Sequence, residues 1–183
     1  LENDQLFGSF HGYGITDLYR VDPRIGTNDQ YRQLVELCHQ RGIKVIMDVI
    51  PNHVGDKHWF IRDLPSMDWI HQFDEFTRTT YRDPVLVDPY GAEKDLREMA
   101  DGWFDSVMPD LNQSNPYLAT YFIQNSIWWT EFSGQDAFRI DTYFYADQDF
   151  MAEWGRRIKE EYPTLTTFGE TWVQGHVFQA RFT

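Results

Sequence analysis

The sequence is poor in several features that mark particular classes of protein. It has a single cysteine, Cys38, which excludes an intrachain disulfide. No run approaches the roughly 20 consecutive apolar residues of a membrane span, and no secretory signal peptide is visible. Basic residues are also scarce, with 16 Lys and Arg against 29 Asp and Glu, for a net charge of −13. Because phosphate binding needs a basic patch, this balance argues against nucleic acid as a partner.

Apolar and aromatic side chains are abundant by contrast. Hydrophobic residues make up 42% and aromatic residues 17% of the 183 positions, enough for one domain with a sizeable core. The aromatic share fits either a thick core or a surface that stacks on flat ligands such as sugars or bases. We interpret the excess of acidic over basic residues as a contribution to solubility. Cys38 stands in a helical pattern and is expected to be a small buried hydrophobe.

The first third of the chain reads as loop, helix and strand. Residues 1–27 are punctuated by glycine and proline and predict a loop. Thr27-Asn28-Asp29 offers an N-cap, and the helical spacing that follows ends at Gly42. Residues 44–50 form a short apolar run rich in β-branched side chains. Such a run predicts a strand buried on both faces, as in a parallel sheet.

Residues 55–107 lack a clean periodicity and are expected to form an irregular insertion, with residues 1–54 and 108–183 as the main body. A long irregular insertion of this kind usually has a function. Its aromatic residues have two readings: they line a ligand groove, or they form a small hydrophobic core within the insertion. Those residues are Trp59, Trp69, Phe73 and Trp103.

Regular structure returns after the insertion. Ser114-Asn115-Pro116 is a cap followed by proline at the first helical position. Residues 137–140 predict a strand, Asp149 opens a further helix, and residues 166–169 predict a strand that ends at Glu170. Helices alternating with strands indicate an α/β fold with parallel strands.

Three acids stand in or directly after these strands. Asp48 lies in the first strand, Asp141 follows the second and Glu170 follows the third. In a barrel of parallel strands, catalytic groups collect at the C-terminal strand ends. Glycoside hydrolysis uses two carboxyl groups that face one cleft. One of them stabilises or attacks the sugar cation, and the other protonates the leaving oxygen.

Arg139 bears on which carboxyl group takes which role. It stands two residues before Asp141, so both side chains point to the same face of the strand. A neighbouring guanidinium keeps a carboxylate ionised, which suits a nucleophile and leaves the acid role to Glu170. The alternative is a structural ion pair, which is the more frequent meaning of such a spacing taken alone.

The order of these motifs resembles the α-amylase family, glycoside hydrolase family 13. The resemblance rests on DVIPNH (48–53), FRID (138–141), FGET (168–171), MPDLN (108–112) and HGYGITDLYRVDPRIGT (11–27). MPDLN and GETW are closest to the neopullulanase and maltodextrin-degrading branch. The resemblance implies a partial (β/α)8 TIM barrel, covering about strands 3 to 5, with residues 55–107 as an inserted domain B after the third strand.

The same resemblance implies a retaining hydrolase that cleaves α-glucosidic bonds in starch-like glucans through a covalent glycosyl-enzyme intermediate. The branch would be that of the α-amylases, neopullulanases or cyclomaltodextrinases. Two alternatives stay open: a transglycosylase or isomerase on the same scaffold, and a non-catalytic glucan-binding homologue. No cofactor is required for the chemistry, and a structural calcium is possible in the family.

Carried over by position, the resemblance assigns roles to eight residues. They are Asp141 as nucleophile, Glu170 as general acid/base, Arg139 beside the nucleophile, Tyr13 as the platform under the sugar, His53 as a donor to the sugar, Trp172 near the leaving group, Asp48 as support, and Asn52 as support and calcium ligand. Phe144 and Tyr145 depart from the family, because many relatives carry Lys-His at these places.

The family's third carboxylate, in a later His-Asp region, has no counterpart in the 183 residues. The chain is therefore expected to be a fragment of a longer one, inactive and poorly soluble by itself. A secreted, periplasmic or cell-envelope location is favoured over the cytoplasm. Linkage specificity and oligomeric state are left open by the sequence.

Overall fold

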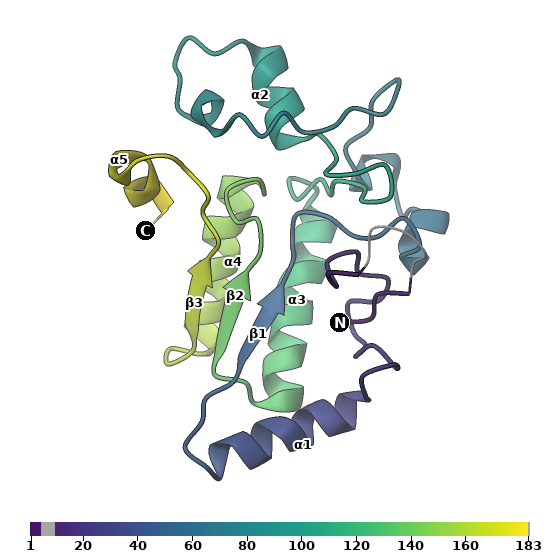
Figure 1. Ribbon diagram of the computed structural model, residues 1–183, viewed down its shortest axis with the longest axis vertical. Coiled ribbons are helices and arrows are strands. Elements are labelled where there is room, and N and C mark those ends of the chain that lie inside the picture. The colour runs from purple at the N-terminus through teal and green to yellow at the C-terminus, as the bar shows by residue number, and fades with distance from the viewer. Residues whose placement is uncertain (5–9, 183) are drawn as a thin grey trace.

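A computed structural model describes residues 1–4 and 10–182 of the chain. Its centre is a three-stranded parallel sheet in the order β1 (Ile46–Val49), β2 (Ala137–Ile140) and β3 (Thr166–Gly169). The strands lie side by side with their C-terminal ends pointing the same way (Figure 1). The predicted α/β class and parallel pairing are confirmed.

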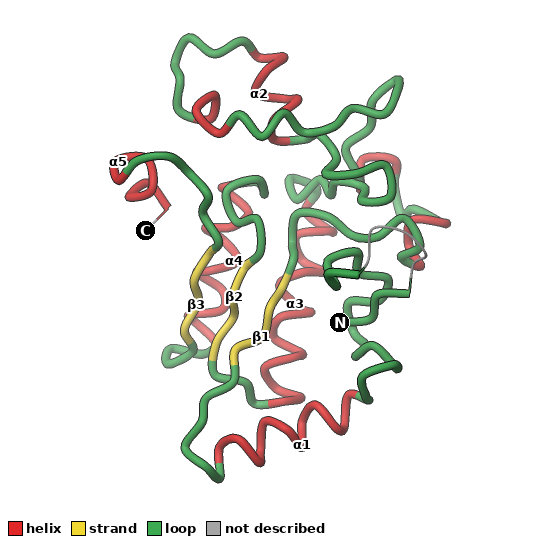
Figure 2. The backbone as a smooth tube through the Cα atoms, viewed as in Figure 1, coloured by secondary structure: helices red, strands yellow, loops and turns green. Residues whose placement is uncertain are grey.

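Helices cover one face of this sheet. The two that lie behind it are α3 (Pro116–Ser133) and α4 (Gln148–Glu161), while α1 (Asn28–His39) crosses beside the N-terminal strand ends (Figures 1 and 2). Phe138 on β2 is fully buried and meets Trp154 of α4 with ring centroids 5.8 Å apart. The core therefore lies between the sheet and these two helices.

The other face of the sheet is open among the described residues, which corrects the prediction for residues 44–50. Met47 is buried toward the helices, but Ile46 is 53% exposed and Asp48 is also exposed. Side chains alternate between the two faces of a strand, and only one face is covered. The strand is thus buried on one side and not on both.

Caps fix where the helices begin. Thr27 and Gln30 form a reciprocal capping box at the start of α1, and Asn115 caps α3 just before Pro116, both as predicted. The cap of α4 is Asp147, whose side chain accepts from the backbone N–H of Phe150, so the helix begins earlier than expected. Cys38 on α1 is half-buried and not buried as expected, because it lies at the edge of the helix face that meets the core.

The N-terminal loop is anchored to α3. The carbonyl oxygen of Leu18 accepts from Asn125 Nδ2 at 2.9 Å and from Trp129 Nε1 at 2.8 Å. Leu18 and Trp129 are both fully buried. This contact holds the segment that carries Tyr13 against the rest of the chain.

The segment between β1 and α3 rises above the C-terminal strand ends (Figure 1). It is mostly irregular, as expected, but it contains one helix that the sequence did not predict, α2 (Glu93–Ala100). Three short 3₁₀ helices complete it: η1 (Trp59–Arg62), η2 (Met67–Trp69) and η3 (Asp83–Leu86). After β3 come α5 (His176–Gln179) and η4 (Ala180–Phe182). Within the described residues, no helix combines the length and the apolar character that crossing a membrane requires.

Candidate active site

Arg139 lies at the centre of a charged group on the open face of the sheet. Its Nη1 is 2.9 Å from Asp48 Oδ1 and 2.7 Å from Asp141 Oδ1, and its Nη2 is 2.8 Å from Glu170 Oε1. The guanidinium is a planar fork of donors, so a single side chain bonds several carboxylates at once. We call these four residues, Asp48, Arg139, Asp141 and Glu170, the strand-end cluster.

The sheet brings the cluster together. Asp48 and Arg139 are paired in register across β1 and β2. The parallel hydrogen-bond ladder continues past the strands, because the N–H of Asp141 donates to Val49 O and that of Glu170 donates to Ile140 O. Gly169 precedes Glu170, and a Cβ there would lie 2.4 Å from the ring of Tyr143. Only glycine lets this strand end approach so closely.

Three effects set the pKa of the Asp141 carboxyl. Burial raises the pKa of this carboxyl, the bond from Arg139 lowers it, and the charge of Glu170 raises it again, with a result of about 6. Arg139 thus acts on Asp141 in the expected direction, but it also bonds Asp48 and Glu170. Contact with Arg139 therefore does not by itself separate the roles of the two carboxyl groups.

Two further donors hold Glu170. Trp172 Nε1 donates to its Oε1 at 2.9 Å, and the N–H of Thr142 donates to its Oε2 at 3.2 Å. Thr142 has a left-handed backbone with φ of 49°, a rare conformation for this residue type that is commonest at functional sites. Trp172 itself is 78% exposed, so its ring is available to a ligand.

Tyr13 joins the cluster through Asp48. Its hydroxyl donates to Asp48 Oδ2 at 3.3 Å, and its ring centroid is 5.9 Å from the guanidinium carbon of Arg139. Asp48 stands in the strand that the sequence predicted to be buried on both faces, so its side chain was expected to be buried. Its side chain is 43% exposed because the face it points to is open, although its oxygens do find partners in Arg139 and Tyr13.

His53 lies outside this network. It is 3% exposed, and both ring nitrogens are buried without a hydrogen-bond partner among the residues that the structure describes. Burial, with a smaller effect of nearby His11, lowers the pKa of His53 to about 4, so the ring is neutral near pH 7. Its ring centroid is 5.0 Å from that of Phe104 in the segment after β1.

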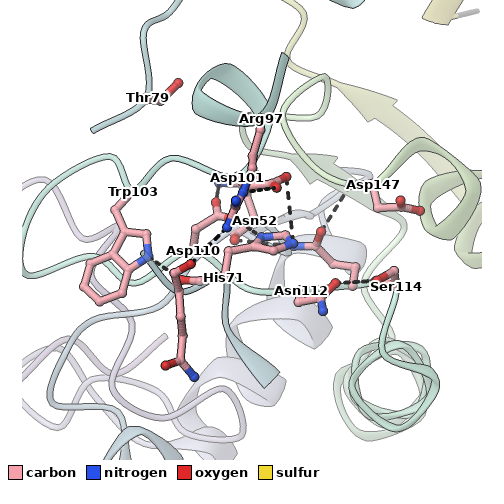
Figure 3. Close-up of polar contacts among 12 residues, drawn as sticks. Asn52, His71, Thr79, Arg97, Asp101, Trp103, Asp110, Asn112, Ser114 and Asp147 are labelled. Atoms are coloured by element: carbon pink, nitrogen blue, oxygen red, sulfur yellow. Dashed lines mark hydrogen bonds and ion pairs between the residues drawn. The ribbon is translucent and has the colours of Figure 1, made fainter. Parts of the chain in front are cut away.

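Asn52 is engaged in a second polar group, which Figure 3 shows. Asn52 Nδ2 donates to Asp110 Oδ1 at 2.8 Å, His71 Nδ1 is 2.7 Å from Asp110 Oδ2, and His71 Nε2 is 3.8 Å from Asp101 Oδ1. Asp110 is 2% exposed. We call Asn52, His71, Asp101 and Asp110 the junction cluster, since it ties the end of β1 to the segment that follows.

The junction cluster binds protons tightly. Burial raises the pKa of Asp110 to about 8, although its bonds to His71 and Asn52 oppose this. Burial lowers the pKa of His71, but the hydrogen bond and charge of Asp110 outweigh burial and leave it raised. The charge on Asp110 favours the proton on His71, so the pair keeps that proton to higher pH than a histidine does in water.

The residues around Asn52 do not fit a calcium ion. Calcium takes about six to eight oxygen ligands. Asn52 Oδ1 is buried and has no partner within residues 1–4 and 10–182, a feature that a cation would satisfy. Both oxygens of Asp110 are already bonded, one to Asn52 and one to His71. In the described part of the chain, no group of three or more His, Cys, Asp or Glu side chains is placed to hold a metal.

A cavity of about 370 Å³ borders Glu170 and has residues in its lining that the sequence did not single out. We call it the aromatic pocket; its lining is Tyr81, Phe104, Thr142, Phe144, Tyr145, Glu170 and Trp172. A second cavity, of about 440 Å³, lies beside the junction cluster and touches none of the strand-end carboxylates. No sequence signal marked Tyr81 or Phe104, because only the path of the insertion brings them to Glu170.

The four aromatic residues of the insertion for which the sequence left two readings all lie outside the aromatic pocket. Trp69 is 7% exposed and packs on Phe60, while Trp103 donates its ring N–H to His71 O. Phe73 stacks under the guanidinium of Arg97. Trp59 is exposed, 55%, but is not among the residues lining the aromatic pocket. Trp69 therefore neither lines a groove nor forms a separate core within the insertion, because it belongs to the main hydrophobic core.

Comparisons with known proteins show which family the chain is similar to. The family model for the alpha amylase catalytic domain matches residues 2–183. Neopullulanase 2 from Thermoactinomyces vulgaris is 30% identical over 166 residues, which cover 90% of this chain and 27% of that protein. A cyclomaltodextrinase from a Bacillus species is 27% identical over 188 residues, covering 92% of this chain and 29% of that protein.

Solved structures also share this fold. The alpha-amylase from Geobacillus thermoleovorans, in a structure complexed with acarbose, superposes with a TM-score of 0.81 at 31% identity and covers 100% of this chain and 37% of that one. The chain thus spans about a quarter to two fifths of the length of these relatives. The family's catalytic domain is a (β/α)8 barrel, and the three parallel strands described above agree with part of one. On this evidence of sequence and shape, the chain belongs to the alpha-amylase family of glycoside hydrolases.

Proposed function

We propose that this chain carries the reaction centre of a retaining hydrolase that cleaves α-glucosidic bonds in starch-like glucans. The observation that carries the proposal is the single guanidinium of Arg139 bonded to Asp141 and Glu170 at the ends of neighbouring parallel strands. Retaining glycosidases hold their two carboxyl groups about 5 Å apart. Two carboxylates on one guanidinium are compatible with that spacing.

In the first step, Glu170 donates a proton to the glycosidic oxygen while the bond from that oxygen to the anomeric carbon breaks. An oxygen of Asp141 attacks the same carbon and forms a glycosyl ester. The positions of the two residues support this division of roles. Glu170 borders the aromatic pocket, where a leaving group has room, and Asp141 does not.

In the second step, a water molecule attacks the anomeric carbon and gives its proton to Glu170. The ester bond breaks, and Asp141 leaves as a carboxylate. The guanidinium of Arg139 stabilises the negative charge that returns to Asp141, and it keeps both carboxyl groups oriented. Every proton that moves in this cycle passes through Glu170.

Tyr13 and His53 are proposed to hold the sugar. The Tyr13 ring lies over the cluster through its bond to Asp48 and serves as a platform. The two unpartnered ring nitrogens of His53 support a role toward substrate hydroxyl groups, because buried polar atoms in native proteins normally find a partner. Trp172 stands on the leaving-group side, next to Glu170.

We further propose that β1, β2 and β3 are the third to fifth strands of the barrel, and that residues 55–107 form domain B. The covered face and the open face of the sheet support this placement, because a barrel strand faces helices outside and other strands' side chains inside. Calcium at Asn52 is not part of the proposal, since the residues there do not fit it.

The test is sugar release from starch, pullulan and cyclodextrin by the protein in its full natural length, with Asp141→Asn as the control. Release that disappears in the variant supports the hydrolase, and the preferred substrate identifies the branch. A folded protein that releases sugar from none of the three contradicts it and favours the transferase or the non-catalytic homologue.

A further inference from the structure

A cavity of about 600 Å³ lies between the N-terminal loop and the segment after β1. We call it the Trp59 cavity; its lining is Glu2, Asp4, Thr16, Asp17, Lys57, Trp59 and Arg62. None of these residues belongs to the strand-end cluster or lines the aromatic pocket. The N-terminal loop lies beside the β1 edge of the sheet, whereas β3, which leads to Glu170, forms the other edge (Figure 1). The cavity is therefore separate from the candidate active site.

Backbone hydrogen bonds hold the two walls of this cavity together. Within the N-terminal loop, the N–H of Glu2 donates to Arg20 O at 2.7 Å, and the N–H of Thr16 donates to Glu2 O at 2.9 Å. Between the walls, the N–H of Gly55 donates to Ile15 O at 2.8 Å. The shape of the cavity is thus fixed by the main chain and not by its exposed side chains.

Polar side chains of the lining are held in place as well. Thr16 is 5% exposed, and its hydroxyl accepts from the N–H of Asp4 at 3.0 Å and donates to Glu2 Oε1 at 3.3 Å. The other oxygen of Glu2 is 3.0 Å from Arg20 Nη1. Arg62 is exposed, and within residues 1–4 and 10–182 its side chain makes no ion pair, so its donors are available to a ligand.

Trp59 offers a flat apolar surface on the opposite wall. It is 55% exposed, yet its ring rests on two buried ones: the centroid of Phe60 is 5.5 Å away, edge to face, and that of His58 is also 5.5 Å away. Phe60 is 1% exposed and His58 is fully buried. An indole anchored on one side and free on the other is a platform for the C–H face of a sugar ring.

The charges of the lining favour a neutral ligand with many hydroxyl groups. Three carboxylates and two cations line the cavity, for a net charge of −1. An ion of either sign meets repulsion there, and a phosphate group would face all three carboxylates. Hydroxyl groups both donate and accept, so they bond carboxylates, guanidinium and ammonium alike. The volume also lies within the range of about 300–1,000 Å³ that is usual for ligand sites.

We propose that the Trp59 cavity is a second, non-catalytic binding site for a segment of glucan chain. This rests on the proposed function, because that function supplies the glucan. A long chain held at this cavity reaches the strand-end cluster at a high effective concentration. Binding here therefore raises the apparent affinity for a polymer and leaves that for a short substrate unchanged.

The kinetic experiment compares a long and a short substrate, with the protein in its full natural length. Soluble starch is the long substrate, and an aryl maltotrioside is the short one. Trp59→Ala is expected to raise KM on starch by about threefold to tenfold, the scale of one aromatic contact, with KM on the maltotrioside unchanged. An equal rise in KM on both substrates overturns the proposal, because Trp59 would then act at the reaction centre.

Calorimetry with maltoheptaose counts the sites directly. The inactive Asp141→Asn variant binds the sugar without cleaving it, and adding Trp59→Ala to this variant is expected to remove one binding site per chain. The same stoichiometry and affinity in both proteins overturn the proposal.

A second lining residue and a matched control complete the set. Arg62→Gln removes a charge from an exposed side chain, and it keeps the test available if Trp59→Ala does not fold; a rise in KM on starch of about twofold to threefold is expected. Tyr90→Ala removes an aromatic ring that is 94% exposed in the same insertion but outside the Trp59 cavity, and KM on starch is expected to stay unchanged.

The outcomes separate this inference from the function it rests on. If Trp59→Ala and Arg62→Gln both hydrolyse starch with the KM of wild type, the second site is overturned and the hydrolase stands. If the folded wild-type protein releases sugar from neither substrate, the proposed function itself is overturned.

Discussion

The strand-end cluster and the junction cluster are built from the same kinds of group, yet they differ in exposure. In the strand-end cluster, one cation meets three carboxylates on an open face, and the Asp48 side chain is 43% exposed. In the junction cluster, Asp110 is 2% exposed and both of its oxygens are bonded within the protein. The two lie at opposite ends of the short stretch from Asp48 to Asn52.

The difference in exposure implies that the two clusters have different roles, one catalytic and one structural. Open carboxylates that share one cation keep room for a substrate, and their pKa values decide which of them carries a proton. Asp110 is buried with both of its oxygens bonded to protein groups, so its carboxylate is closed to a substrate, and its bonds hold one segment of the chain to another. We therefore expect variants of the first to change rate and variants of the second to change stability.

The largest effect is expected from Asp141→Asn. The amide does not form the glycosyl ester, so kcat/KM on the preferred glucan falls by at least about 10⁴-fold, as for the loss of other essential catalytic groups. The melting temperature stays close to that of wild type. Glu75→Gln, at an exposed position of the insertion, is the control and retains full activity.

Arg139→Lys is expected to have the next largest effect. A lysine keeps the charge but lacks the planar fork that bonds Asp48, Asp141 and Glu170 together. We expect a loss of about 100-fold in kcat, comparable with the loss of one preorganised electrostatic donor. A variant with unchanged kcat would mean that Arg139 is only a structural ion pair.

The pH dependence of kcat/KM reports on Asp141. Attack requires the ionised carboxylate, and burial together with Glu170 raises the pKa of Asp141 to about 6 against the opposing effect of Arg139. The acidic limb of the pH profile is thus expected to be centred near pH 6, with kcat/KM falling about tenfold per pH unit below it. An acidic limb centred near pH 4 would show that the substrate-free carboxyl is not shifted.

His71→Gln tests the junction cluster. The substitution removes the partner of a buried Asp110 oxygen, so the free energy of unfolding is expected to fall by about 2 kcal/mol. Chemical denaturation measures the change, and kcat is the comparison quantity. His176→Gln, at an exposed histidine of α5, is the matched control. A large drop in kcat with stability unchanged would reverse the roles assigned to the two clusters.

The smallest effect is expected from metal removal. Because both oxygens of Asp110 are bonded to protein groups, incubation with a calcium chelator should leave the melting temperature unchanged. Thermal denaturation with and without added calcium measures this. A clear rise in melting temperature with calcium would show that Asn52 and its neighbours do bind the ion.

The sequence predicted the parts of the molecule that depend on local pattern. The strands predicted at residues 137–140 and 166–169 are β2 and β3 in the structure, and α1 and α3 begin at the predicted caps Thr27 and Asn115. The strand ends then placed Asp141 and Glu170 on one guanidinium, because parallel strands end at one edge.

What the sequence did not predict depends on long-range packing. The exposure of Asp48 follows from which face of the sheet is covered, and no local pattern carries that information. Tyr81 and Phe104 reach Glu170 only because the insertion folds back over the strand ends. The pairing of His71 with Asp110 joins residues 39 positions apart in an irregular segment.

The most direct test of the central claim is to trap the glycosyl ester. The protein in its full natural length is incubated with an activated fluorosugar donor whose ester hydrolyses slowly, and its peptides are analysed by mass spectrometry. The account predicts one added glycosyl group on the peptide that contains Asp141, absent from Asp141→Asn. A label on Glu170, or turnover of the donor without any label in a folded and active protein, would contradict the assignment of Asp141 as the nucleophile.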